Sequence, residues 1–108
     1  MDSDVRKIAD RLKMLANETR LQILCELIEG PKTVGTLVQR LNSLSQSAIS
    51  QHLALLKAHG VVEDHRTGQN ITYSIADRRV EEVIAVLKRN YCEHRASPVT
   101  PPDKPSLG

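Results

Sequence analysis

The hydrophobic pattern of this chain changes its period at Gly60, and this change constrains the fold more than any other feature of the sequence. Before Gly60, apolar residues recur at three- and four-residue steps, which is the spacing of one helical face. After it, an extended segment runs from Val61 to His65, and residues 71–75 alternate apolar and polar side chains as a half-buried strand does. The glycine-centred segment 66–70 predicts a turn, so the two extended segments form a β-hairpin.

Two helices joined by a turn precede the hairpin. Thr33 can cap the first helix and Ser45 the second, because their hydroxyl oxygens accept hydrogen bonds from unpaired backbone N–H groups. The second helix runs to about Ala58. The inner face of the first helix holds Val34, Leu37, Val38 and Leu41. A helix–turn–helix followed directly by a hairpin is typical of a winged helix, and the pattern is specific because several independent elements must occur in this order.

Further amphipathic helices are predicted on both sides of this unit. One spans residues 4–15, a second begins after the N-cap Asn17 and ends at Gly30, and a last one begins after the N-cap Asp77. Their apolar stripes are Val5, Ile8, Leu12 and Leu15 in the first, Leu21, Leu24, Cys25 and Ile28 in the second, and Val80, Ile84, Leu87 and Tyr91 in the last.

The predicted fold class is therefore mainly α with a small β-hairpin, a winged helix-turn-helix in the order α-α-α-α-β-β-α. The chain has 108 residues, which suits one domain, and we assign the folded winged-helix domain to residues 1–95. Four of the five prolines fall in residues 96–108. Proline blocks regular structure, so this segment is predicted to be a disordered Pro-rich tail.

Composition and charge narrow the functional class. The net charge of +2 is compatible with nucleic acid binding without proving it. No apolar run is long enough to span a bilayer and the N-terminus lacks the apolar core of a signal peptide, so we expect a cytoplasmic protein with no membrane partner. An enzyme is not expected, because neither a catalytic triad motif nor a glycine-rich phosphate loop occurs; no cofactor is expected either.

The helix that begins after Ser45 has two contrasting faces. Ile49, Leu53 and Leu56 fall on one side and are expected to pack inward. The opposite face is short, polar and free of acids; the DNA-binding residues predicted on this helix are Gln46, Ser47, Ser50, Gln51, His52 and Lys57. Gln can pair with adenine edges and Ser can contact bases or phosphate, so this helix is predicted to read a major groove. A solvated polar face is the alternative, and His52, at the border of the two faces, is either structural or a DNA contact.

The tip of the predicted hairpin is also polar. Arg66 and Gln69 are predicted DNA contacts there, flanked by His65 and Asn70. An Arg on a protruding ribbon can reach the sugar-phosphate backbone or an adjacent minor groove. Such contacts would make affinity fall steeply with salt. An ordinary solvated turn is the alternative.

Three segments resemble the ArsR/SmtB family of bacterial winged-helix repressors: LANETRLQIL at residues 15–24, LSQSAISQHL at 44–53 and GVVE at 60–63. The resemblance covers about residues 5–92. It implies a homodimer joined through the first and last helices, bound to a pseudo-palindromic double-stranded operator and released by an inducer. The apolar stripes of both terminal helices agree with this implication.

Cys25 and Cys92 resemble, by their positions, the cysteines of the dithiol-sensing, BigR/SqrR/HlyU-like branch of that family. The resemblance implies that a disulfide or polysulfide bridge between them, formed by a persulfide or another oxidant, releases the repressor from DNA. Lys88 and Arg89 precede Cys92 and should favour its reactive thiolate. The alternative is that both cysteines are structural, since Cys is among the most buried residue types.

Two other functions stay open. The first is a metal-responsive repressor, for which Glu93 and His94 are the candidate ligands; they lack the i, i+3 or i+4 spacing of two ligands on one helical face, so no metal site is predicted. The second is a protein-interaction module that uses the winged-helix fold without reading DNA.

Overall fold

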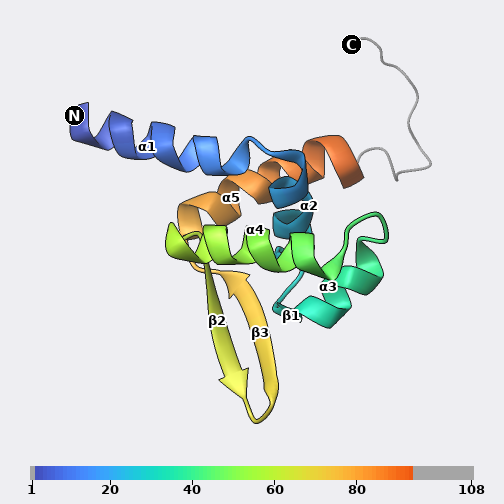
Figure 1. Cartoon of the computed structure of the whole chain (residues 1–108). Coiled ribbons are helices and arrows are strands. Elements are labelled where there is room, and N and C mark those ends of the chain that lie inside the picture. The colour runs from blue at the N-terminus through green and yellow to red at the C-terminus, as the bar shows by residue number, and fades with distance from the viewer. Residues whose placement is uncertain (1, 94–108) are drawn as a thin grey trace, which may run out of the picture.

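The computed structural model describes residues 2–93, with side chains for residues 3–91 (Figure 1). The predicted tail at 96–108 lies outside the described residues. The elements in chain order are α1 (Asp2–Leu15), α2 (Glu18–Leu27), β1 (Lys32–Thr33), α3 (Val34–Arg40), α4 (Gln46–Ala58), β2 (Val62–Thr67), β3 (Asn70–Ile75), α5 (Arg78–Leu87) and η1 (Lys88–Glu93). The mainly helical fold with a small antiparallel sheet confirms the predicted class.

The four predicted N-caps are confirmed. The side-chain oxygens of Asn17, Thr33 and Ser45 each accept a hydrogen bond from the backbone N–H three residues further on, at 3.0, 3.1 and 3.1 Å. Asp77 accepts from the N–H of Arg79 at 2.9 Å. Local hydrogen bonds of this kind fix where α2, α3, α4 and α5 begin, which is why these helix starts could be predicted from sequence.

The core lies where α2, α4, α5 and the base of the hairpin meet. Ile23 and Leu24 of α2, Leu53 of α4 and Ile84 of α5 are all completely buried. The predicted stripe of α2 packs on the core but was incomplete: it lacks Ile23 and Leu27, which are buried, whereas its members Leu21, Cys25 and Ile28 are half-buried. The reason is that α2 contacts α4, α5 and β3 together, so its buried surface is wider than a single stripe.

The sheet has three strands in the order β1-β3-β2, not the two strands of the predicted hairpin. Strand β1 pairs antiparallel with β3, with Lys32 opposite Tyr73 and Thr33 opposite Thr72. A two-residue strand shows no periodicity, so sequence reasoning could not find it. Its pairing covers the base of β3, which would otherwise present unpaired backbone groups.

The hairpin turn is tighter than predicted. Strand β2 extends to Thr67 and β3 begins at Asn70, so two residues connect them instead of the predicted segment 66–70. Gly68 adopts a φ of +63°, a conformation that glycine provides without steric cost and that two-residue hairpins require. As a result Arg66 lies in β2, opposite Ile71.

The last helix also differs from the prediction. The α-helical part ends at Leu87, and the chain continues as the π-helical turn η1. Val80 and Ile84 are buried as predicted, whereas Leu87 and Tyr91 are exposed to 41% and 69%. In the described part of the chain, no helix has the length and apolar character needed to cross a membrane.

Candidate DNA-reading surface and cysteine site

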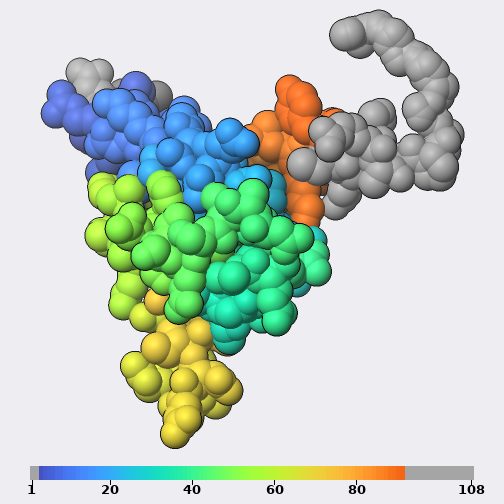
Figure 2. All heavy atoms as spheres, turned by 45° about the vertical axis from the view of Figure 1, so that its right-hand side comes forward, coloured from blue at the N-terminus to red at the C-terminus, as the bar shows by residue number. Residues whose placement is uncertain are grey.

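Helix α4 separates an apolar inner side from a polar outer side. Ile49, Leu53 and Leu56 are completely buried against α2, α3 and β2. The outer side exposes Gln46, Ser47, Ser50 and Gln51, and the first turn of the helix contains no acidic residue. Figure 2 shows α3 and α4 forming one surface, with the β2–β3 hairpin projecting beyond it. The structure therefore brings four of the predicted DNA-binding residues onto one exposed face.

His52 is different, because it is half-buried and faces α2. Its Nδ1 lies 3.5 Å from an Nη atom of Arg20. The same guanidinium donates through Nε to the backbone oxygen of Met14 at 2.7 Å. This places His52 in the contact between α4 and α2, which agrees with the structural alternative for this residue. Arg20 was missed from sequence because nothing local signals a contact to a residue so distant along the chain.

Lys57 is exposed, but its ammonium group is bound by the β2–β3 hairpin, which is the wing of the winged helix. Its Nζ donates to Oδ2 of Asp64 on β2 at 2.9 Å. This hydrogen bond raises the pKa of Lys57 and lowers the pKa of Asp64, so both groups stay charged at neutral pH. Because Asp64 offsets the charge of Lys57, the pair offers less attraction to phosphate than a lone lysine would.

The tip of the wing carries the remaining predicted contacts. Arg66 and Gln69 are both exposed there, as are His65 and Asn70. The hairpin extends away from the core on the same side as α3 and α4 (Figure 2). Arg66 and the outer face of α4 are therefore available to one ligand, as expected for a winged helix that holds DNA.

The opposite end of the molecule exposes apolar side chains. On α1, Val5, Ile8 and Leu12 are 55%, 57% and 52% exposed. On α5, the exposed apolar residues are Val83, Val86 and Leu87, followed by Tyr91 in η1. Only Met14 and Leu15 of α1 join the described core. An amphipathic helix whose apolar stripe faces water calls for a covering partner.

Cys25 lies half-buried in α2, packed against the core. The side chain of Lys88, at the start of η1, crosses to this helix: its Nζ donates to the backbone oxygen of Cys25 at 3.0 Å and to Oε2 of Glu29 at 2.8 Å. The backbone of Cys92 lies in η1, four residues beyond Lys88, while its side chain lies outside the described residues. The structure thus brings η1 against α2 at Cys25.

The Lys88–Glu29 contact belongs to a larger ionic cluster. Burial by itself would lower the pKa of Lys88, but the hydrogen bond and charge of Glu29 outweigh it and raise the value. The same hydrogen bond lowers the pKa of Glu29. Arg40 of α3 pairs with Glu29 at 3.6 Å and also with Glu26, and Lys32 of β1 donates to the backbone oxygen of Glu26 at 2.9 Å. The C-terminal part of α2 and the turn that follows it, which contains Glu29, are therefore linked by charge to η1, β1 and α3.

The candidate metal ligands cannot be placed. The side chain of Glu93 and the whole of His94 lie outside the described residues. Among the residues that are described, no group of three or more His, Cys, Asp and Glu side chains could hold a metal ion.

A winged helix-turn-helix with an acid-free polar face on α4 is typical of DNA-binding transcriptional regulators. The family model described as bacterial regulatory protein, arsR family, matches residues 17–64. The chain is also 43% identical over 93 residues to the transcriptional activator HlyU of Vibrio cholerae, covering 86% of this chain and 85% of HlyU. The chain belongs to the ArsR family.

Solved structures agree with this assignment. HlyU from Vibrio cholerae superposes with a TM-score of 0.79 over 85% of this chain and 99% of that chain, and a structure of reduced HlyU matches equally well, at 0.79. The transcriptional repressor BigR from Xylella fastidiosa is 30% identical, with a TM-score of 0.76, over 85% of this chain and 93% of that one. The homodimeric winged helix-turn-helix domain of Mb0332 from Mycobacterium bovis is 29% identical, with a TM-score of 0.71, over 92% of each chain.

Proposed function

We propose that this protein is a homodimeric repressor that binds a pseudo-palindromic operator and releases it when Cys25 and Cys92 become linked by a disulfide or polysulfide bridge. The acid-free outer face of α4, with Gln46, Ser47, Ser50 and Gln51 exposed next to the wing, is the observation that carries the DNA-binding part. Small polar side chains allow the helix to approach base edges closely. The wing adds Arg66 and Gln69 as backbone or minor-groove contacts. Because its target is chromosomal DNA, the proposed repressor acts in the cytoplasm.

The dimer is supported by the exposed apolar side chains of α1 and α5. Burying Val5, Ile8 and Leu12 together with Val83 and Val86 against a second copy would remove an unfavourable apolar surface from water. A twofold dimer presents two copies of α4, and its two half-sites lie about 34 Å apart on the DNA. The homodimeric winged-helix domain of Mb0332 offers a precedent in a similar protein.

The thiol switch is supported by the contact of Lys88 with the backbone of Cys25, which holds the helix that carries Cys92 against α2. Cys92 lies in η1 four residues beyond Lys88, so the segment that begins at this contact carries the second cysteine, which supports the proposed bridge. The description of one HlyU structure as reduced indicates that redox state distinguishes forms of that relative.

The proposed chemistry conserves atoms and electrons. A cysteine thiolate attacks the outer sulfur of an organic persulfide, so that a protein persulfide forms and the organic thiolate leaves. The second cysteine then attacks the inner sulfur of this persulfide, closing a disulfide and releasing hydrogen sulfide. If both cysteines are persulfidated first, the same step leaves a trisulfide bridge and again releases hydrogen sulfide.

A mobility-shift assay with and without an organic persulfide tests the switch. We expect wild-type protein to lose its operator after treatment, and Cys25→Ser and Cys92→Ser to keep it. Intact-protein mass spectrometry identifies the product: a gain of bridging sulfur indicates a polysulfide bridge, and a loss of two hydrogens alone indicates a disulfide. Equal release of both variants and wild type would disprove the dithiol switch. Treatment with Zn²⁺ in a parallel arm tests the metal-responsive alternative.

A further inference from the structure

Two corners of the chain meet at the base of the wing. Helix α4 ends at Ala58 with His59 as its C-cap, and Val61 leads into β2; on the neighbouring corner, Ala76 follows β3 and Asp77 caps α5. The backbone N–H of Ala76 donates to the oxygen of Val61 at 2.8 Å, and the N–H of Val61 donates to the oxygen of Leu56 at 2.9 Å. The end of the DNA-reading helix and the start of the last helix are therefore joined at this place.

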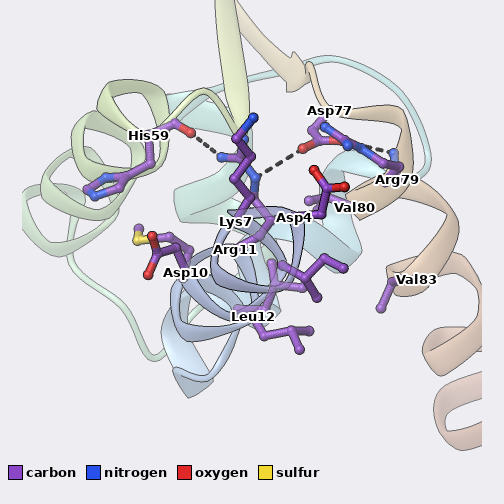
Figure 3. A pocket seen from close by; sticks show the side chains of 13 residues that line it. Asp4, Lys7, Asp10, Arg11, Leu12, His59, Asp77, Arg79, Val80 and Val83 are labelled. Atoms are coloured by element: carbon purple, nitrogen blue, oxygen red, sulfur yellow. Dashed lines mark hydrogen bonds and ion pairs between the residues drawn. The ribbon is translucent and has the colours of Figure 1, made fainter. Parts of the chain in front are cut away.

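A single side chain from α1 spans this junction (Figure 3). Arg11 donates through Nη1 to the backbone oxygen of His59, and its Nε lies 3.1 Å from Oδ2 of Asp77. Arg11 lines a cavity of about 390 Å³ between α1, the end of α4 and the start of α5. Its side chain is 34% exposed, whereas that of Asp77 is only 6% exposed. One guanidinium thus contacts both corners.

Both of its acceptors favour a cation. The oxygen of His59 lies at the C-terminal end of α4, where backbone carbonyls lack intrahelical partners and the helix dipole is negative. Asp77 is buried, which by itself would raise its pKa; hydrogen bonds from the backbone N–H and side chain of Arg79 and the charge of that side chain outweigh burial and lower the pKa. The carboxylate is therefore charged at neutral pH, and Arg11 neutralises it from the α1 side.

The position of Arg11 has a consequence for the dimer. Its helix also carries Ile8 and Leu12, which are exposed and belong to the proposed dimer seam. Its contact Asp77 starts α5, the other helix of that seam. The guanidinium therefore connects both helices of the proposed seam to the C-cap of α4.

We propose that Arg11 is a positioning residue for operator binding, which sets the angle between α4 and the dimer seam. The inference rests on the proposed homodimeric operator binding. Arg11 supplies no base contact itself. Its loss leaves each α4 able to read one half-site but lets the two copies depart from the separation that the operator requires. Affinity for a complete operator then falls, while affinity for one half-site is unchanged.

The test compares full-length Arg11→Gln and Arg11→Lys with wild type, and uses Arg6→Gln as a matched control, because Arg6 is an exposed arginine of the same helix. A duplex is selected from a random library with wild-type protein. Fluorescence anisotropy then measures binding to this duplex, to a version with one half-site scrambled, and to a series in which the half-site spacing changes by single base pairs. Sedimentation and circular dichroism monitor the dimer and the fold.

For Arg11→Gln we expect at least a tenfold loss on the complete duplex, less than a twofold change on the single half-site and a broader tolerance of spacing. Arg11→Lys should lie between Arg11→Gln and wild type, because one ammonium group cannot reproduce the two-sided contact of a guanidinium. Arg6→Gln should match wild type.

An equal loss of Arg11→Gln on the complete and the half-site duplex would overturn the inference, since it would indicate a local defect of α4. Unchanged binding to the complete duplex would overturn it as well. If Arg11→Gln does not fold, the spacing series with Arg11→Lys decides: an unaltered spacing preference overturns the inference. Failure of wild type to prefer two half-sites over one would instead disprove the proposed dimeric function.

Discussion

The two ends of this molecule differ in where their apolar side chains lie. At the α4 and wing end, apolar residues such as Leu53 are completely buried and the outer surface is polar. At the α1 and α5 end, apolar residues such as Ile8 and Val86 face water. The first arrangement is complete in one chain and offers a polar surface to a charged ligand. The second leaves an apolar surface that the proposed dimer would cover. The contrast separates a reading unit from an association unit.

The largest expected effect follows from charging the association unit. Leu12→Glu places a carboxylate in the proposed dimer seam, so we expect a monomer and a loss of about a thousandfold in affinity for a two-half-site duplex, within the range that linked binding modules gain. Sedimentation velocity and anisotropy measure both. Leu55→Glu is the matched control, because Leu55 is a 39% exposed leucine on α4 outside the seam, and it should stay dimeric. If the Leu12→Glu variant stays dimeric, the α1 surface is not the dimer seam, and the proposed division between the two ends is wrong.

The next effect concerns the reading face. The double variant Ser47→Ala plus Gln51→Ala removes hydrogen-bonding groups from the outer side of α4, so specific affinity should fall about 10- to 100-fold, whereas affinity for unrelated duplex should change little. Competition anisotropy with specific and scrambled duplexes measures both quantities. Ser3→Ala, an exposed serine on α1, is the control. Retained specificity in the double variant would contradict the assigned face.

The ionic cluster at the C-terminal end of α2 and the following turn gives a third prediction, which concerns the coupling between the proposed cysteine site and the DNA-reading surface. Glu29 contacts Lys88 of η1 and Arg40 of α3, so it lies between the proposed cysteine site and the helix-turn-helix. Glu29→Gln should still form the persulfide-induced bridge, seen by mass spectrometry, but its release from DNA should weaken about tenfold, corresponding to roughly 1.4 kcal/mol of coupling. Glu82→Gln is the control, because Glu82 pairs only within α5 among the described ion pairs. Full release by Glu29→Gln would show that coupling uses another route.

The buried carboxylate gives a pH-dependent prediction. Because the pKa of Asp77 is lowered in the folded protein, its contribution to stability is present at neutral pH and is lost as the pH falls toward and through the folded pKa. Asp77→Asn should lower the free energy of unfolding by about 1–2 kcal/mol at pH 7, through the weakened cap and lost charge pairs, and by less at about pH 3. Urea unfolding monitored by circular dichroism measures this. Asp10→Asn, an exposed position, should change it by less than about 0.5 kcal/mol.

The smallest effect is expected at the wing. Arg66→Ala removes one exposed positive charge, so affinity should fall only a few-fold and the slope of log K against log salt should decrease by about one. Anisotropy titrations at several salt concentrations measure the slope. Arg78→Ala, which removes an exposed arginine from α5, should leave the slope unchanged. An unchanged slope for Arg66→Ala would mean that the wing tip does not contact phosphate.

Local signals explain why so much of the fold could be predicted. The caps Asn17, Thr33, Ser45 and Asp77 each bond to a backbone group two or three residues away, so both partners appear together in the sequence. The inner face of α4 was equally readable, because Ile49, Leu53 and Leu56 repeat at the helical period. Strand β1 was not predicted, because its partner on β3 lies far along the chain and two residues are too few to show a hydrophobic period.

The DNA-reading surface could be predicted where its residues lie on a single helix. The contacts that join two elements could not. Gln46, Ser47, Ser50 and Gln51 share the exposed face of one helix, as the spacing predicted. The engagement of Lys57 by Asp64, and of His52 with Arg20, requires the packed arrangement of neighbouring elements. The hydrophobic period of one helix does not indicate which side chain of a neighbouring element its residues will contact.

The amino-acid sequence alone determined the order of the α-helices and the β2–β3 hairpin, the starts of α2, α3, α4 and α5, and the polar face of α4, because helix caps and hydrophobic periods act over a few residues. Tertiary structure decided that Arg11 meets His59 and Asp77, and that Lys88 reaches Cys25 and Glu29. Such contacts depend on the relative positions of packed helices. Those positions are fixed only in the folded core, because each helix packs against several other elements at once.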